Sequence, residues 1–154
     1  MIDADSSKHE QYIQRACELA REAGERGDDP YGSLLVHDDE IIMEATNRIN
    51  TENDISHHPE LALARRATQE LKPEIAAETI LYTSTEPCPM CSTAMVYAAI
   101  GGVVYSVSGK QASELRGGGT GGIPCDEVFE RLGADISVAG PLLEDEGKSV
   151  HRSF

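Results

Sequence analysis

The hydrophobic positions of this chain recur with helical spacing in several segments. Between residues 7 and 27, apolar residues occur every three or four positions among Glu, Arg and Lys, which predicts an amphipathic helix. Ser6 or Ser7 can cap its start, and Gly27 can end it. The same spacing predicts helices at residues 59–71 and 88–100, a short helix at 126–132 and a final helix from residue 142 onward.

Five short apolar runs lie between these helices and predict strands. They span residues 32–36, 41–45, 79–83, 102–106 and 135–138, and the first two flank a polar turn at Asp38 and Asp39, as in a β-hairpin. Strands that alternate with helices imply parallel pairs joined by crossovers, with helices on both faces of the sheet. We therefore predict an α/β fold, a three-layer α/β/α sandwich around a mixed, partly parallel five-stranded sheet. One domain over residues 1–154 is expected from the length.

Two segments lack a regular pattern and are predicted to be loops. Residues 47–56 are polar, and residues 109–123 carry six glycines and few apolar residues, which predicts a mobile loop. The run of glycines at 117–122 could also cradle a phosphate. No Lys-Ser or Lys-Thr pair supports that alternative, and no strand-loop-helix context does so either.

The charge of the chain narrows the range of partners. Its net charge is −14, from 27 acidic and 13 basic residues, and only Lys8, Lys72, Lys110 and Lys148 are lysines. Such a surface repels phosphate backbones, so nucleic acid is not the expected partner. An acidic, lysine-poor surface resembles that of proteins from salt-loving microbes, and we hypothesise a halophilic protein; the alternative is an acidic mesophilic one.

The N-terminal residues are polar and lack the features of a secretory signal or transit peptide. No apolar run approaches the roughly 20 residues of a membrane helix. We therefore expect a cytoplasmic protein with no membrane contact, whose four cysteines bind metal or are buried rather than form disulfides. Cys17 lies on the apolar stripe of the first helix and is predicted to belong to the core.

Two short segments carry candidate metal ligands: His58-Pro59-Glu60 and, further along, Pro87-Cys88-Pro89-Met90-Cys91. One imidazole and two thiolates are ligands that zinc takes, and they leave a fourth position for water, whereas a closed structural site would need a fourth Cys or His. Cys88 and Cys91 are three residues apart at a helix start, so both sulfurs can face one ion. The positive end of the helix dipole also favours thiolates.

Glu60 follows the histidine by two residues and can move protons beside such an ion. A carboxylate can take a proton from the attacking water and then donate protons to the ring nitrogen and the leaving amine, which an amide cannot do. The order H-x-E followed by P-C-x-x-C is the signature of zinc-dependent base deaminases. The alternative is a purely structural zinc site.

Three further segments extend this resemblance. Residues 83–91, Thr-Ser-Thr-Glu-Pro-Cys-Pro-Met-Cys, resemble the T-S-x-E-P-C-x-M-C segment of the cytidine deaminase-like superfamily, in the branch of guanine deaminase, fungal-type cytosine deaminase and tRNA adenosine deaminase. Residues 30–33 are similar to the P-F-G-A segment of that branch, and Asn47 matches its Asn after the second strand. The resemblance covers about residues 8–108.

The resemblance implies one Zn²⁺ per subunit on His58, Cys88 and Cys91, with proton transfer by Glu60. It also implies substrate binding by Asn47, Tyr31 and Phe154, the last as an aromatic group that closes the pocket. Asn47 could instead be a turn residue, and Phe154 a frayed end.

Other residues near these segments receive other roles or depart from the pattern. His57 is expected to face solvent or to contact the metal ligands without binding the metal itself. Glu86 is expected to accept hydrogen bonds from backbone N–H groups. Pro59 replaces the commoner Ala, which a first helical turn should tolerate. The segment after Tyr105 lacks the acidic residue of many relatives, and the glycine-rich loop fits none of theirs well.

The leading functional hypothesis is a zinc-dependent hydrolytic deaminase of a free nucleobase or nucleoside, of the guanine or cytosine type. The first alternative is tRNA adenosine-to-inosine deamination, which would need a basic face. The second is a non-catalytic, zinc-stabilised binding module. The resemblance also implies a homo-oligomer, most simply a dimer.

Overall fold

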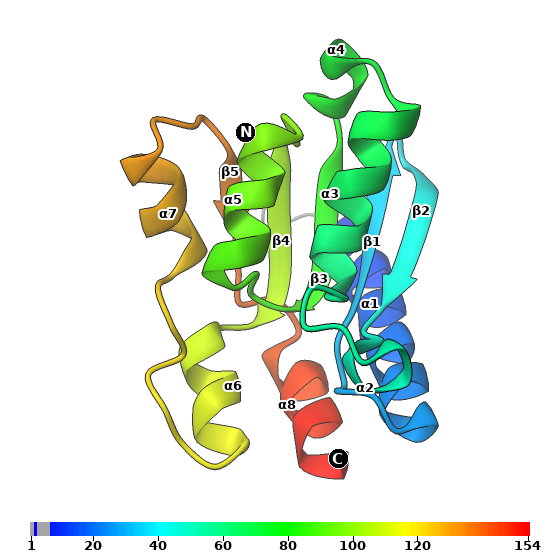
Figure 1. Cartoon of the computed structure of the whole chain (residues 1–154), viewed down its shortest axis with the longest axis vertical. Coiled ribbons are helices and arrows are strands. Elements are labelled where there is room, and N and C mark those ends of the chain that lie inside the picture. Colours follow the sequence, from blue (N-terminus) through cyan, green and yellow to red (C-terminus); the bar gives the residue numbers. More distant parts are fainter. Residues whose placement is uncertain (1, 3–6) are drawn as a thin grey trace.

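A five-stranded mixed sheet lies at the centre of the computed structural model, which describes residue 2 and residues 7–154 (Figure 1). The strands are β1 (Gly32–His37), β2 (Glu40–Thr46), β3 (Ile80–Thr85), β4 (Gly102–Val107) and β5 (Ser137–Ala139). Their order across the sheet is β2-β1-β3-β4-β5. Strand β1 is antiparallel to β2 and β3, and β3, β4 and β5 are parallel. The predicted hairpin and the predicted mixed sheet are both confirmed.

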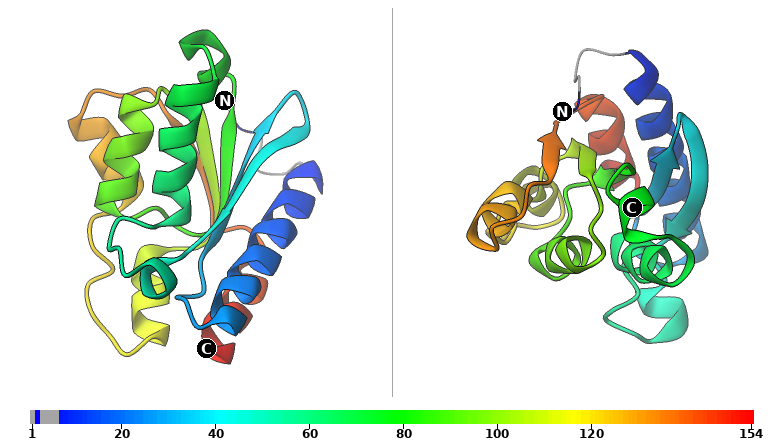
Figure 2. Two further views of the ribbon diagram at one scale, coloured as in Figure 1. Left: turned by 45° about the vertical axis from the view of Figure 1, so that its right-hand side comes forward. Right: turned by 90° about the horizontal axis from the view of Figure 1, so that it is seen from above.

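Helices cover both faces of this sheet (Figure 2). Helices α1 (Ser7–Arg26) and α8 (Glu144–Ser153) lie on one face, and α3 (Pro59–Glu70), α5 (Pro89–Tyr97) and α7 (Cys125–Arg131) lie on the other. The shorter helices are α2 (Ile49–Glu52), α4 (Pro73–Ala76) and α6 (Gly109–Leu115). The three-layer α/β/α sandwich is therefore confirmed.

The core consists of two clusters, one on each side of the sheet. Leu34, Val36 and Tyr82 point toward α1 and α8, whereas their neighbours Leu35 and Leu81 point toward α3 and α5. This alternation follows from the two-residue period of a strand. Each such side chain contributes about 1.5–3 kcal/mol when fully buried. Both faces are apolar, which explains why the strand sequences read as continuous hydrophobic runs.

Gly32, at the start of β1, allows helix α1 to approach the sheet closely. A Cβ at this position would lie 2.5 Å from the backbone nitrogen of Ala20 and 2.6 Å from the carbonyl oxygen of Ala16. Only a residue without a Cβ fits there. Gly32 in the segment Pro30-Tyr31-Gly32-Ser33 thus has a packing role.

The prediction of a loop over residues 109–123 is wrong for its first half, where α6 forms. Ser108 caps this helix, because its Oγ accepts a hydrogen bond from the backbone N–H of Gln111 over 3.1 Å. All of residues 110–115 except Ser113 are good helix formers, and the nearby glycines obscured them. Helix α2 within the predicted loop 47–56, and α4 after Pro73, were also not expected. Ser6, one candidate cap of α1, lies outside the described residues.

The glycines after α6 fold the chain back over that helix. Gly117, Gly118, Gly119, Gly121 and Gly122 all have positive φ angles. A Cβ at Gly121 would lie 2.4 Å from the backbone of Lys110, so the two backbone segments touch. These glycines serve backbone conformation and close packing.

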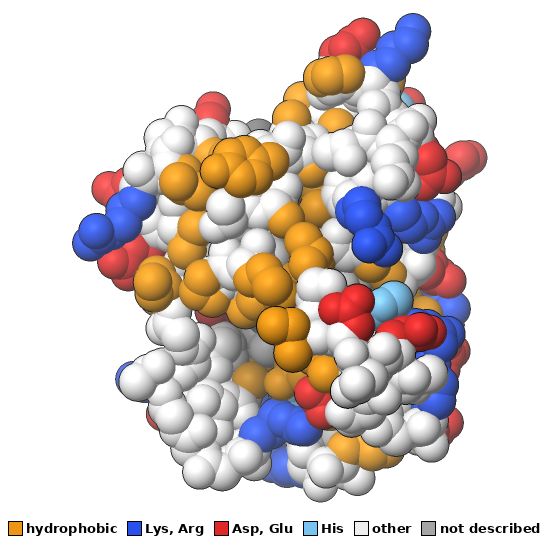
Figure 3. All heavy atoms as spheres, in the orientation of Figure 1, with side chains coloured by type: hydrophobic (Ala, Val, Ile, Leu, Met, Phe, Trp, Pro, Cys, Tyr) orange, Lys and Arg blue, Asp and Glu red, His pale blue; other side chains and the backbone are white. Residues whose placement is uncertain are grey.

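Several large apolar side chains are exposed in α5 or in the segments that flank α3 and α7, the helices of one face of the molecule. Tyr97 is 79% exposed and Ile55 is 82% exposed, and Met90, Ile123 and Leu132 are exposed to a smaller degree. Figure 3 shows apolar side chains gathered over this face. We call these five residues the apolar face.

All four cysteines are free, and Cys17 is fully buried in the cluster beside α1, as predicted. Over the part of the chain that the structure describes, no helix combines the length and the apolar character needed to cross a bilayer.

Candidate metal centre and active site

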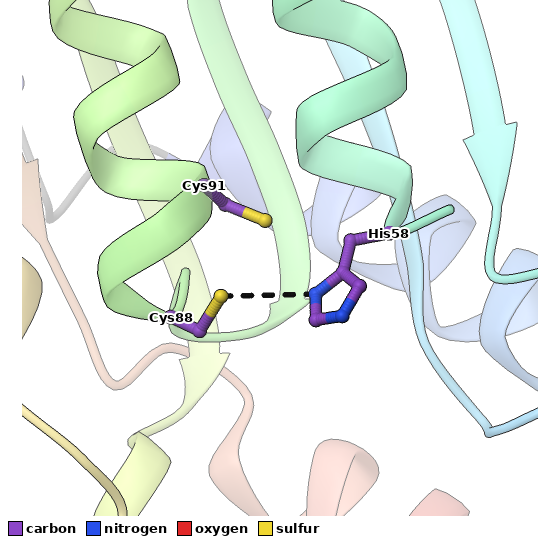
Figure 4. A group of neighbouring side chains, drawn as sticks. All are labelled: His58, Cys88 and Cys91. Carbon is purple, nitrogen blue, oxygen red and sulfur yellow. Dashed lines mark hydrogen bonds between the residues drawn. The ribbon is translucent and has the colours of Figure 1, made fainter. Parts of the chain in front are cut away.

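The three candidate ligands meet where helices α3 and α5 begin. His58 immediately precedes α3, Cys88 immediately precedes α5, and Cys91 lies in the first turn of α5. One donor atom from each residue lies within 4.8 Å of the other two. Figure 4 shows both sulfurs and the imidazole pointing toward a common space. The structure thus brings together the ligand set read from the sequence.

The spacing of the donor atoms fits zinc. Zinc–sulfur and zinc–nitrogen bonds of about 2.3 and 2.05 Å at a tetrahedral angle place the two donor atoms about 3.6 Å apart. The distance from His58 Nδ1 to Cys88 Sγ is 3.7 Å. The set holds three ligands, as in catalytic zinc sites, which keep one position open.

Proline occupies the first turn of both helices, as Pro59 and Pro89. Its fixed φ angle suits this position, and the N–H that it lacks would have no partner within the helix. Pro59 in place of Ala is therefore accommodated, as expected.

The three ligands contact one another, and these contacts shift their pKa values. The hydrogen bond from Cys91, and then that from His58, lower the pKa of Cys88 to about 4 despite burial. The same contact with Cys88, together with burial, raises the pKa of Cys91, and Cys88 also raises the pKa of His58. A negative charge on Cys88 favours the binding of a dication.

Glu60 is buried beside the ligands and is held by hydroxyl groups of the sheet. It is only 4% exposed, and its Oε1 lies 2.7 Å from Thr83 Oγ1. Ser33 Oγ donates to Thr83 Oγ1 over 2.8 Å, because Ser33 on β1 and Thr83 on β3 are register partners. Burial raises the pKa of Glu60, which the hydrogen bond from Thr83 partly opposes. A raised pKa suits a carboxyl group that must both accept and donate protons near neutral pH.

A pocket of about 260 Å³ opens over His58, Cys88 and Glu60. This volume lies just below the range of roughly 300–1,000 Å³ for small-molecule sites. Its walls include Tyr31, Thr85 and Arg116 in addition to His58 and Glu60.

The three residues assigned to substrate binding occupy different places. Tyr31 lines the pocket. Asn47 is buried and does not line the pocket: its backbone N–H donates to the carbonyl oxygen of Tyr31 over 3.0 Å, and its Oδ1 accepts from the N–H of Ile49. This is the geometry of a turn residue. Phe154 does not line the pocket and instead packs on Gly24 of α1, where a Cβ would lie 2.7 Å from its ring.

Glu86 accepts backbone hydrogen bonds, as predicted. Its two carboxylate oxygens each accept one N–H at 2.9 Å, from Gly109 at the start of α6 and from Cys125 at the start of α7. The carboxylate therefore ties two helices to the loop that carries Cys88. His57 is outside the ligand set and outside the pocket wall.

Sequence reasoning missed several residues of the site. Ser33 and Thr83 could have been noticed as hydroxyls in otherwise apolar strands. Thr85 lines the pocket, and its Oγ1 lies 2.8 Å from Nε2 of the buried His151 of α8. Arg116 follows the last turn of α6, and no local pattern marks it.

Comparisons with known proteins agree with this geometry. The model of the cytidine and deoxycytidylate deaminase zinc-binding region matches residues 6–107. Guanine deaminase from Bacillus subtilis is 38% identical over 107 residues, which cover 69% of each chain. A probable cytosine deaminase from Schizosaccharomyces pombe is 32% identical over 158 residues, which cover 97% of this chain and 93% of the relative.

A solved structure from work on A-to-I editing by tRNA:A34 deaminases is similar over 92% of this chain and 99% of its own, with 28% identity and a TM-score of 0.70. Zinc is the metal of the matched family, and the three clustered ligands suit it. The chain therefore belongs to the cytidine and deoxycytidylate deaminase family and has the fold of zinc-binding deaminases.

Proposed function

We propose that this protein is a zinc-dependent hydrolytic deaminase that converts the exocyclic amine of a free nucleobase or nucleoside, of the guanine or cytosine type, to a carbonyl group. The observation that carries the proposal is the placement of Glu60. This carboxyl group is buried at the edge of a small pocket, beside three ligands whose geometry fits zinc. Relatives named as guanine deaminase and probable cytosine deaminase support the substrate type.

The residues of the pocket suggest how the reaction proceeds. Zinc supplies Lewis-acid activation of water near neutral pH. Glu60 takes one proton from the attacking water and passes it to the ring nitrogen beside the amine-bearing carbon. It then delivers the second proton of that water to the departing amine, so that ammonia leaves and the carbon keeps the oxygen as a carbonyl. Thr83 holds Glu60 in place during both transfers.

Three residues are proposed to contact the substrate. Tyr31 lines the pocket and offers a ring face to a base. Asn47 is joined to Tyr31 by a backbone hydrogen bond, so we propose that it contacts the base when that turn shifts. Phe154 packs on Gly24 within its own chain, so closing the pocket would require the C-terminus to move or a second copy to donate it.

tRNA deamination is the second candidate, and one feature of the structure favours it. Arg26, Arg48, Arg65 and Arg66 line one surface groove together with His57, the neighbour of a zinc ligand. The similarity to a structure from work on tRNA:A34 deaminases points the same way. Against it stand Glu22 and Glu44 in the same groove, the ion pair between Arg26 and Asp28, and the net charge of −14.

We also propose a cytoplasmic homodimer in which residues 1–154 form one deaminase domain. The apolar face supports association, since large contiguous apolar patches mark contact surfaces. Light scattering should report twice the chain mass. Tyr97→Asp should yield monomers, whereas the exposed control Glu74→Lys should not.

Ammonia release from a panel of compounds tests the function. The panel contains guanine, cytosine, adenine, their nucleosides and a tRNA anticodon stem-loop, all assayed in high salt. Activity on one or more of the guanine or cytosine compounds is the expected result. Activity on RNA alone would favour tRNA deamination, and no ammonia release from any compound of the panel would favour a non-catalytic, zinc-stabilised module.

A further inference from the structure

Arg116 places a cation in the pocket wall without a close anionic partner. Within residues 7–154, the carboxylate nearest to it in an ion pair is Asp29, at 3.9 Å, which is beyond hydrogen-bond distance. Its guanidinium carbon lies 5.8 Å from the centre of the Tyr31 ring. The side chain is 29% exposed and lines the same pocket as His58 and Glu60. A guanidinium has five N–H donors, and within residues 7–154 those of Arg116 make no hydrogen bond to a protein acceptor.

The two carboxyl groups that line the pocket, those of Glu60 and Glu86, already accept hydrogen bonds from the protein. Both oxygens of Glu86 accept backbone N–H groups, and Glu60 is bound by Thr83. Neither carboxylate is paired with Arg116 in an ion pair among the described residues. The guanidinium is therefore available to a ligand.

The position of Arg116 is fixed relative to the zinc ligands. Helix α6 begins at Gly109, whose N–H is held by Glu86, two residues before Cys88. At the other end of α6, the N–H of Gly118 donates to the carbonyl oxygen of Ser113 over 2.8 Å and turns the chain back. Arg116 lies between these two anchors.

We propose that Arg116 is a specificity-determining residue that donates hydrogen bonds to an oxygen acceptor of the substrate. This inference rests on the proposed function. A ring carbonyl and a phosphate group both supply such an oxygen, and guanidinium donors suit either. A site built to hydrogen-bond one group discriminates strongly against a ligand that lacks it, because its donors are then left unpaired. Bases without an exocyclic oxygen should therefore bind poorly.

The test compares two competitive inhibitors that differ in one carbonyl group, hypoxanthine and purine, on the zinc-loaded enzyme. For the unaltered protein, hypoxanthine should bind more tightly. In Arg116→Met, the inhibition constant of hypoxanthine should rise about 10- to 100-fold, whereas that of purine should change less than about twofold. Inorganic phosphate is the third inhibitor. A loss of phosphate inhibition in the variant with an unchanged hypoxanthine-to-purine ratio would identify the acceptor as a phosphate oxygen.

Two further variants sharpen the comparison. Arg116→Lys keeps the charge but not the planar fork, so it should recover only part of the discrimination. Lys110→Met removes an exposed cation from the same helix without touching the pocket wall and should change none of the constants.

Two outcomes would overturn the proposal, and they differ from each other. If the unaltered protein releases ammonia but Arg116→Met leaves phosphate inhibition intact and either weakens hypoxanthine and purine equally or changes neither, then only the inference about Arg116 fails. If the unaltered protein releases no ammonia from any base or nucleoside, then the proposed function fails and the inference falls with it.

Discussion

Replacing Thr83 with valine removes one hydroxyl from a buried set of hydrogen bonds that ends on Glu60. Thr83 Oγ1 lies 2.7 Å from Glu60 Oε1 and 2.9 Å from the carbonyl oxygen of Thr85, and it accepts a hydrogen bond from Ser33. Valine keeps the shape, so the change is chiefly electrostatic. A hydrogen bond to a charged group contributes about 1.5–3 kcal/mol, and each 1.4 kcal/mol is a factor of ten. We expect kcat to fall by about 10- to 100-fold, with KM nearly unchanged.

The same substitution leaves the fully buried Ser33 hydroxyl without its acceptor, which should lower the free energy of unfolding by about 1–3 kcal/mol. Adding Ser33→Ala removes this unpaired hydroxyl donor, so the double variant Ser33→Ala/Thr83→Val should regain part of the stability but none of the activity. Thr83→Ser should recover both.

Steady-state ammonia release, urea unfolding and zinc analysis on the four proteins separate these effects. A folded, zinc-loaded Thr83→Val enzyme with kcat within twofold of the unaltered protein would refute the positioning of Glu60 by Thr83.

Three other predictions concern stability and metal binding. Burial alone would raise the pKa of Asp28, but hydrogen bonds from Thr51 and Arg26 hold that pKa below its usual range. The ionised Asp28 therefore contributes to the free energy of unfolding above about pH 4, and this contribution is lost as the pH falls further. Asp28→Asn should therefore lower the free energy of unfolding by about 2 kcal/mol at pH 7 and by less at pH 3, and an equal loss at both would count against this. If the acidic surface is halophilic, the melting temperature should rise between low and molar salt; no rise would leave an acidic mesophilic protein. Cys91→Ser should lower the zinc content well below one ion per chain by atomic absorption, since a serine hydroxyl is a poor replacement for a thiolate ligand, and full occupancy would contradict its role.

The metal centre could be predicted from the sequence because its ligands are local. His58 with Glu60, and Cys88 with Cys91, are each fixed by spacing within one helical turn, and strand order brings the two helix starts together. The strands were predictable for a similar reason, since burial on both faces gives unbroken apolar runs such as that of β1.

Other features were not predicted, either because they depend on tertiary contacts or because neighbouring residues obscured the sequence pattern that indicates them. Arg116 reaches the pocket through α6, whose start is held by Glu86, 30 residues earlier in the sequence, and no local pattern indicates this contact. Helix α6 did carry a signal: Ser108 and Gln111 form the S-x-x-Q pattern of a capping box, which the following glycines overshadowed. For Asn47 the sequence left substrate binding and a turn role open, and the contacts with Tyr31 and Ile49 are what show the turn geometry.

The substitution Glu60→Gln, assayed by ammonia release and zinc content on the same preparation, tests the central claim most directly. Glutamine keeps the size of the side chain and removes its ability to carry protons. We predict a folded protein with one zinc per chain whose ammonia release is lower by about 100- to 10,000-fold. Activity within a few-fold of the unaltered enzyme, with zinc still bound, would contradict the assignment of Glu60 as the proton carrier.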